Sequence, residues 1–164
     1  MIDRLIVDCM QAASVDIAFS LPCNMLSGVL DEIDRRAIMR IPVCREEEGV
    51  GIAAGAGLAG RRPILVMQNS GLGNCINALA SLTGLYRLPL FLLMSHRGGP
   101  AEQFAAQIPM GQAVPRLLDS LNIPHRRVEK PADFDGLSSF MRQTYDNGAI
   151  GAALLSRELW HAQK

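Results

Sequence analysis

The sequence lacks long apolar runs and any excess of charge of one sign. Its longest apolar runs, such as residues 88–94, fall far short of the roughly 20 residues that a membrane-spanning helix needs. The 16 basic and 16 acidic side chains cancel, and no Lys/Arg-rich run provides a surface for nucleic acid. Charged residues interrupt the N-terminal apolar pattern, unlike in a signal peptide. We therefore expect a protein that binds neither a membrane nor nucleic acid.

Closely spaced metal ligands are also missing. The cysteines form no CxxC pair and the histidines are scattered; these residues are Cys9, Cys23, Cys44, Cys75, His96, His125 and His161. The spacing predicts neither a protein-ligated metal nor a disulfide framework. Reduced thiols fit a cytoplasmic protein.

One glycine-rich stretch imitates a nucleotide-binding loop. Residues 55–60 (GAGLAG) match G-x-G-x-x-G, but a dinucleotide loop directly follows a strand and opens a helix, whereas this match lies late in an expected helix. Gly71 and Gly73 do follow an expected strand, yet no third glycine comes at the right spacing. No G-x-x-x-x-G-K-[ST] occurs. A nucleotide-binding α/β domain therefore has no phosphate loop to support it.

The hydrophobic pattern alternates between strands and helices along the chain. Apolar runs predict strands at residues 16–20, 39–44, 64–68, 88–95, 123–128 and 149–156. Helical spacing predicts helices at residues 2–13, 25–37, 45–60, 74–86, 112–121 and 131–145. This alternation predicts a single α/β domain over residues 1–164, built on a three-layer, doubly wound parallel sheet. Ligands bind such sheets beyond the carboxyl ends of the strands, so the corners of interest are residues 20–24, 44–48, 68–74 and 95–100.

Three consecutive glutamates, Glu46, Glu47 and Glu48, open a helix of small and apolar residues. Acidic residues in a first helical turn complement the helix dipole and are usually solvated, and composition alone favours that interpretation. Against it, the residues three, four and seven positions after Glu47 are small or apolar. A carboxyl group on that face would be partly desolvated, which favours a protonated or hydrogen-bonding form.

Polar residues gather at two further corners. Five of them follow the strand expected at residues 64–68: Gln68, Asn69, Ser70, Asn74 and Asn77. They are good turn formers, and they can equally make a ligand surface.

At the corner after residue 95, Arg97 is suited to bidentate binding of an anionic group. His96 beside it can donate a hydrogen bond or shuttle a proton. The alternative is that Arg97 is an ordinary surface residue and that His96 makes its hydrogen bonds within the protein, so that neither binds a ligand.

These stretches together resemble the pyrimidine-binding domain of thiamine-diphosphate enzymes. REEEG (residues 45–49), a small-residue helix, a strand and QNSGLGN (residues 68–74) are similar to the Arg-His-Glu-Gln-Gly and Thr-Ser-Gly-Pro-Gly stretches of acetolactate synthases. MQNSGLGN is closer still to phosphonopyruvate and sulfopyruvate decarboxylases. SHRG (residues 95–98) and AQIPMG (residues 106–111) resemble stretches of the alpha subunits of sulfopyruvate decarboxylases. The resemblance covers essentially the whole chain.

The resemblance implies that Glu47 is the catalytic residue. It would hydrogen-bond N1′ of the aminopyrimidine of thiamine diphosphate and favour its imino tautomer. Gly57 stands where the family usually has an aromatic residue, which loosens the register and leaves Glu46 as a lesser candidate. The resemblance also implies cofactor contacts for Asn69, Ser70, Gly71 and Asn74, and substrate contacts for Arg97, His96, Gln107, Ser20 and Asn24.

One motif of these enzymes is missing. They bind the diphosphate and Mg²⁺ through a Gly-Asp-Gly motif with an Asn farther along the chain, and no Gly-Asp-Gly occurs in this sequence. The resemblance therefore implies a partner, a beta subunit that carries the diphosphate-binding domain and Mg²⁺. The active site would lie at the interface of the two chains.

The implied reaction is decarboxylation of a small anionic 2-oxo acid. Sulfopyruvate would give CO₂ and sulfoacetaldehyde, a precursor of coenzyme M. Phosphonopyruvate or another 2-oxo acid is the nearest alternative, because sulfonate and phosphonate differ by one charge and a single arginine does not decide between them. A non-catalytic binding or regulatory module of the same fold is the alternative from another class.

Overall fold

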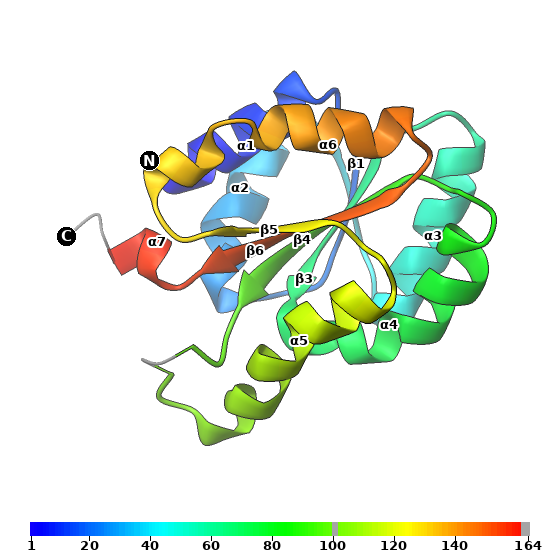
Figure 1. Cartoon of the computed structure of the whole chain (residues 1–164). Helices are drawn as coiled ribbons and strands as arrows, with labels where there is room; N and C mark the ends of the chain where they lie inside the picture. The colour runs from blue at the N-terminus through cyan, green and yellow to red at the C-terminus, as the bar shows by residue number, and fades with distance from the viewer. Residues whose placement is uncertain (100–101, 162–164) are drawn as a thin grey trace.

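The chain forms a parallel sheet of six strands between two layers of helices (Figure 1). This computed structural model describes residues 1–99 and 102–161. The strands are β1 (Ile17–Ser20), β2 (Met39–Pro42), β3 (Pro63–Gln68), β4 (Leu90–His96), β5 (His125–Val128) and β6 (Ile150–Ser156). Their order across the sheet is β2-β1-β3-β4-β6-β5, and every neighbouring pair is parallel. The predicted α/β parallel-sheet fold is confirmed.

Helices cover both faces of the sheet (Figure 1). One face carries α1 (Ile2–Ala12), α2 (Ser27–Arg35) and α6 (Leu137–Asp146), and the other carries α3 (Glu46–Leu58), α4 (Leu72–Ala78) and α5 (Ile108–Ser120). The shorter turns are η1 (Asn24–Leu26), η2 (Asn69–Gly71), η3 (Leu79–Gly84), η4 (Ala105–Gln107) and η5 (Pro131–Phe134), and α7 (Glu158–His161) follows β6. None of the helices in the described ranges has the length and hydropathy that a bilayer crossing requires.

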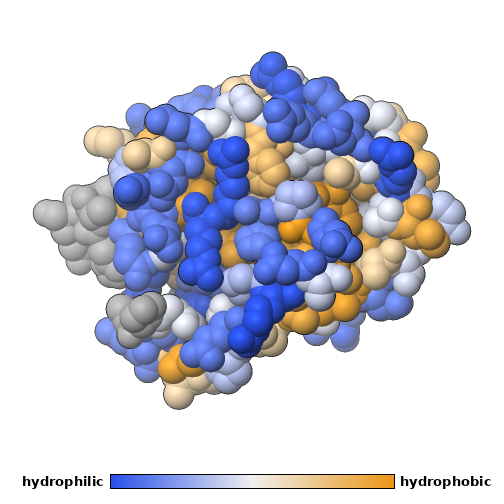
Figure 2. Space-filling view, viewed as in Figure 1, coloured by the Kyte–Doolittle hydropathy of each residue, from blue (hydrophilic) through white to orange (hydrophobic). Residues whose placement is uncertain are grey.

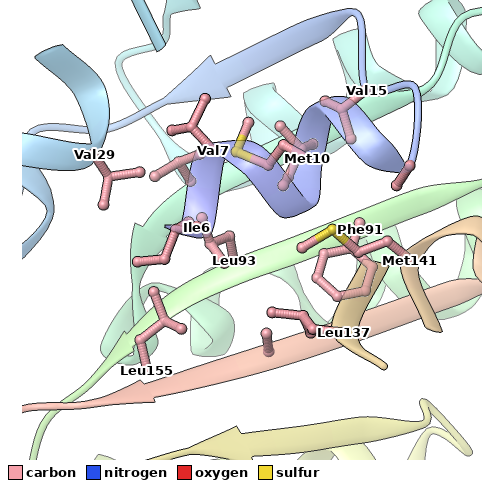
Figure 3. Close-up of a cluster of buried hydrophobic side chains, with 14 of the residues drawn as sticks. Ile6, Val7, Met10, Val15, Val29, Phe91, Leu93, Leu137, Met141 and Leu155 are labelled. Carbon is pink, nitrogen blue, oxygen red and sulfur yellow. The ribbon is translucent and has the colours of Figure 1, made fainter. Parts of the chain in front are cut away.

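An apolar core on each side of the sheet holds the three layers together. Strand β4 contributes to both cores: Phe91 and Leu93 face α1 and α6, whereas Leu92 faces α3, α4 and α5. Figure 3 shows the first core, where Met10 of α1 and Met141 of α6 lie over the sheet beside Phe91. Because β3, β4 and β6 are buried on both faces, their sequences are nearly continuous apolar runs, the pattern that predicted them.

Three helices differ most from their predicted bounds. The one expected at residues 131–145 is divided into η5 and α6, with Gly136 at a φ of +74° between them. The helix expected at residues 74–86 starts at once after β3 as η2, continues as α4 and ends in the wider π turn η3. Helix α5 begins at Ile108, earlier than the expected residue 112, because Pro109 is tolerated in a first helical turn, where its missing N–H has no partner to lose. A second proline, Pro115, lies inside α5 and affects the site described below.

The strand order fixes where a ligand would meet the sheet. From β1 the chain crosses to β2 on one side and then returns to β3 on the other, so the topological switch point lies between β1 and β3. Ligands bind α/β sheets in the crevice outside the carboxyl ends of the strands at such a point. The start of α3 and the corners after β1, β3 and β4 therefore share one edge of the sheet.

Candidate active site

The first turn of α3 gives different partners to its three glutamates. Glu48 caps the helix, since its Oε2 accepts the backbone N–H of Cys44 at 2.8 Å and that of Arg45 at 3.4 Å. Glu46 accepts a hydrogen bond from Asn74 Nδ2 at 2.9 Å. Two members of the triplet are thus committed to contacts within the chain.

Glu47 keeps one oxygen without a donor. Its Oε1 lies 2.5 Å from Arg45 Nε, and its Oε2 is buried without a hydrogen-bond partner in the described part of the chain. The pKa of Glu47 is lowered, first by its own backbone N–H and then by Arg45. Of the two forms expected for Glu47, protonated or hydrogen-bonding, the lowered pKa contradicts the protonated one and agrees with the hydrogen-bonding one, because these donors outweigh burial. The side chain is an anionic carboxylate with one acceptor position open.

The corner after β3 ties three parts of the site together. Asn69 is fully buried, and its amide exchanges two hydrogen bonds with the backbone of Arg97, at 3.1 Å and 3.2 Å. Gln68 Nε2 donates to Ser70 Oγ at 2.7 Å and to Gln107 Oε1 at 2.8 Å. These bonds hold the ends of β3 and β4 and the start of α5 in one arrangement.

Gly71 and Asn74 lie against Glu46 rather than Glu47. A Cβ atom at Gly71 would collide with the Glu46 carboxyl group, so only glycine permits this approach. Asn77 is separate from this corner, since it is exposed and its Oδ1 accepts the hydroxyl of Ser81 at 3.3 Å. The predicted cluster of five polar side chains thus has four members at the edge of the sheet.

His96 is oriented by an irregularity of α5. Its Nε2 lies 3.0 Å from the carbonyl oxygen of Gly111. In a regular helix that carbonyl would accept the N–H of residue 115, but Pro115 has none. Since a carbonyl only accepts, Nε2 carries the proton, and burial lowers the pKa of His96 and keeps its ring neutral.

Arg97 is paired with a residue that the sequence did not single out. Its Nε and Nη2 donate to Glu102 at 2.7 Å and 2.6 Å, and its guanidinium lies 5.5 Å from the centre of the Phe104 ring. The side chains of Arg97 and Glu102 are 16% and 2% exposed. The backbone N–H groups of Gly98 and Phe104 also donate to Glu102, each at 3.1 Å. The only sequence signal for this pair is an acid five positions after the arginine.

The two residues predicted at the end of β1 lie differently from each other. Ser20 is buried, and its hydroxyl accepts Arg40 Nη1 at 3.3 Å. Asn24 is exposed at the start of η1. A neighbour reaches the site instead: Cys23 Sγ lies 3.3 Å from the hydroxyl of Ser95, which is buried at the end of β4. Cys23 lies in the corner at residues 20–24 that the sequence analysis expected to face a ligand, although Cys23 itself was not singled out there.

A cleft of about 300 Å³ opens beside the ends of β4, β5 and β6. Its lining residues are His96, Gly99, Glu102, Arg127, Glu129, Ser156, Arg157 and Glu158. Glu47 lies outside this cleft, at the start of α3. The chain therefore presents an open carboxylate and a charged cleft as two parts of the same edge.

Comparisons with known proteins assign the chain to a family. Residues 2–114 match the family model described as thiamine pyrophosphate enzyme, N-terminal TPP binding domain. The sulfopyruvate decarboxylase subunit alpha of Methanothermobacter thermautotrophicus is 50% identical over 125 residues, which are 76% of this chain and 76% of that protein. That of Methanococcus maripaludis is 48% identical over 120 residues, 73% of this chain and 72% of that protein.

A longer relative aligns with the whole chain. The sulfopyruvate decarboxylase of Methanosarcina acetivorans is 33% identical over 162 residues, which are 99% of this chain and 42% of that protein. The chain belongs to the thiamine pyrophosphate enzyme family with the N-terminal TPP binding domain, and within it to the group of the sulfopyruvate decarboxylase alpha subunits.

Proposed function

We propose that this chain is the alpha subunit of a thiamine-diphosphate-dependent carboxy-lyase that converts sulfopyruvate to sulfoacetaldehyde and CO₂. The family membership supports the cofactor, and the relatives' names support the substrate. The product, sulfoacetaldehyde, would enter coenzyme M biosynthesis. A cytoplasmic location is part of the proposal, supported by the four free cysteines.

The observation that carries the proposal is the open oxygen of Glu47. A buried carboxylate oxygen is stabilised only when a donor reaches it, and no donor within the described chain does so. The N1′ position of the cofactor's aminopyrimidine, in its imino form, is a ring N–H donor that matches this acceptor. When bound, thiamine diphosphate supplies the nucleophile and the electron sink for decarboxylation. Glu47 would hold the pyrimidine in the reactive tautomer through a charge-assisted hydrogen bond.

The remaining predicted residues would orient the ligands around Glu47. Ser70, Gly71 and Asn74 would border the cofactor. Asn69 would fix the position of Arg97, since both of its amide atoms bond the Arg97 backbone. Arg97, His96 and Gln107 would contact the substrate, with Ser20 and Asn24 on the β1 side. We expect these residues to bind and position the substrate while the cofactor carries out the bond cleavage.

A partner subunit is part of the proposal. The relatives' name, subunit alpha, implies an enzyme of more than one subunit. We expect a beta subunit that carries a Gly-Asp-Gly motif, the diphosphate contacts and Mg²⁺. The outer side of α3 and the turn after η3 expose four apolar side chains: Ile52, Leu58, Leu85 and Tyr86. Figure 2 shows apolar surface gathered over the side of α3 and α4. Such a surface suits burial against another chain.

Glutamine substitutions along the triplet test the role of Glu47. With the partner co-expressed, we expect Glu47→Gln to lower kcat at least about 100-fold, because an amide gives a far weaker interaction than a carboxylate. Assembly, measured by size-exclusion chromatography, should be unchanged. Glu46→Gln and Glu48→Gln are matched controls and should keep activity within about tenfold. Activity of Glu47→Gln at a tenth of wild type or better would show that the assignment is wrong.

Arg97→Ala tests the substrate site. We expect a KM for sulfopyruvate at least about tenfold higher, because an arginine N–H bond to an anion is lost. Arg126 provides a control, because its guanidinium lies 5.1 Å from the centre of the Phe140 ring of α6 and not beside Arg97. Arg126→Ala should leave KM unchanged. An unchanged KM in Arg97→Ala would remove Arg97 from the site.

The alternatives predict other outcomes. A phosphonopyruvate decarboxylase would turn over phosphonopyruvate with the higher kcat/KM in steady-state assays of the two acids. A non-catalytic module would show neither thiamine-diphosphate binding nor turnover with its partner present.

A further inference from the structure

The most saturated charged pair at the candidate site is the one between Arg97 and Glu102. The two bonds between them use two of the five N–H donors of the guanidinium, which leaves three for other partners. Glu102 also accepts two backbone N–H groups, so it is held in place independently of Arg97. Together with Arg97 these donors lower the pKa of Glu102 to about 2, so its charge persists at any working pH. Arg97 therefore offers donors to a ligand while its positive charge is cancelled.

The surroundings of the pair do not restore a positive charge. Glu102 lines the cleft with two other carboxylates, Glu129 and Glu158, and two guanidinium groups, Arg127 and Arg157. The lining thus has three carboxylates against two guanidinium groups, and Arg97, which is not among the lining residues, is paired with Glu102. His96 adds no charge, since burial lowers its pKa. A ligand that enters here meets hydrogen-bond donors in a site with no net positive charge.

We propose that Glu102 determines the specificity of the site, by cancelling the charge of Arg97 so that a monoanionic sulfonate is accepted and a dianionic phosphonate is rejected. The proposal rests on the proposed function, because it assumes that Arg97 faces the substrate's second anionic group. A sulfonate has one acidic proton and a single charge. A phosphonate has two, and a phosphoryl group carries roughly one and a half to two charges at pH 7. The second charge finds no counter-charge here and is repelled by Glu102.

Glu102→Gln in the complex with the partner subunit tests this proposal. The amide can still accept a bond from Arg97 but carries no charge, so the guanidinium regains its full attraction for an anion. We expect kcat/KM for phosphonopyruvate to rise about tenfold relative to that for sulfopyruvate, mainly through KM. This is the factor expected when one charge about 5 Å away is removed at an effective dielectric constant of about 40.

Two control variants separate this charge from other causes. Glu102→Asp keeps the charge and should keep the preference for sulfopyruvate. Asp119→Asn removes an equal charge from an exposed residue of α5 that does not line the cleft, and should change the ratio less than twofold. An unchanged ratio in Glu102→Gln, or an equal change in Glu102→Asp or Asp119→Asn, would overturn the proposal.

The wild-type complex provides a test that needs no variant to fold. Between pH 8 and pH 5.5 a phosphonate gains its second proton, with a pKa near 6 like that of a phosphate, whereas sulfonate and Glu102 keep their charges. We expect KM for phosphonopyruvate to fall about tenfold relative to that for sulfopyruvate over this range. The other ionisable groups around the cleft are His96, Arg127, Arg157, Glu129 and Glu158. Any effect that they have on the binding of a monoanion is common to both acids and cancels from the ratio. A constant ratio would overturn the proposal. Absence of turnover of both acids would instead refute the proposed function.

Discussion

The start of α3 and the loop after β4 both place a carboxylate beside an arginine, but they satisfy it to different degrees. In the glutamate turn (residues 45–48), Glu47 has one oxygen paired with Arg45 and one buried oxygen without a donor in the described chain. In the arginine loop (residues 96–99 and 102–107), each oxygen of Glu102 accepts two hydrogen bonds. An unsatisfied buried acceptor is unfavourable until a ligand pairs with it, whereas a saturated pair fixes local geometry. The first region is therefore suited to recruit a ligand, and the second to position one.

The two regions also differ in how closely a glycine is packed: Gly71 of η2 packs against the glutamate turn, and Gly98 lies in the arginine loop. A side chain at Gly71 would meet the Glu46 carboxyl group, which lies at the end of a flexible side chain. A side chain at Gly98 would lie 2.5 Å from the Gln107 carbonyl oxygen and 2.8 Å from the Gly111 Cα atom, both of which are backbone. Gly98 also has a φ of +87°, where other residues are strained. A side chain at Gly98 would thus be harder to accommodate than one at Gly71.

Alanine substitutions at these glycines would give the largest difference between the regions. We expect Gly98→Ala to lower the free energy of unfolding by about 3 kcal/mol, from a positive φ and a backbone collision. Gly71→Ala should cost less than about 1 kcal/mol, because Glu46 can turn away. Urea unfolding followed by circular dichroism measures both. Equal losses of free energy of unfolding would show that Gly71 and Gly98 tolerate a side chain equally well.

Acid unfolding would sharpen the same comparison with a smaller effect. The pKa of Glu102 is about 2, against an ordinary value of 4.5, so the ionised form stabilises the folded chain. That stabilisation is complete above about pH 4.5 and is lost as the pH falls toward about 2. We expect the free energy of unfolding of the wild type to fall more steeply over this window than that of Glu102→Gln.

The matched variant in the other region is Glu47→Gln. The pKa of Glu47 is also lowered, but its side chain is 33% exposed, so solvent screens its interactions. Its acid unfolding curve should follow that of the wild type closely. A curve for Glu102→Gln that runs parallel to the wild type would contradict a stabilising Glu102 charge.

The sequence predicts the sheet better than it predicts the site. Strands β3 and β4 are recognisable because they are buried on both faces and carry polar residues only at their carboxyl ends. Glu47 is predicted by family resemblance, because its distinguishing feature, an oxygen without a donor, exists only once Arg45 and the helix are in place. Glu102 was missed since its partner depends on the path of a glycine-rich loop. The bond between His96 and α5 was missed for the same reason, because it needs two separate elements to pack.

A substitution at Pro115 of α5 would give the smallest effect, confined to His96 in the arginine loop. We expect Pro115→Ala to supply an N–H that bonds the Gly111 carbonyl within α5 and so competes with His96. The bond to Gly111 raises the pKa of His96 against the larger effect of burial. Weakening this bond should lower the pKa of His96 further.

Nitrogen-15 NMR of the imidazole rings measures both the pKa and the tautomer of His96 in wild type and Pro115→Ala. In the wild type the proton should lie on Nε2, because the Gly111 carbonyl accepts from it. In Pro115→Ala the Nδ1–H tautomer should gain population, since the carbonyl that selected Nε2–H is now shared. If His96 keeps its pKa and tautomer, the packing of β4 orients its ring without help from the proline.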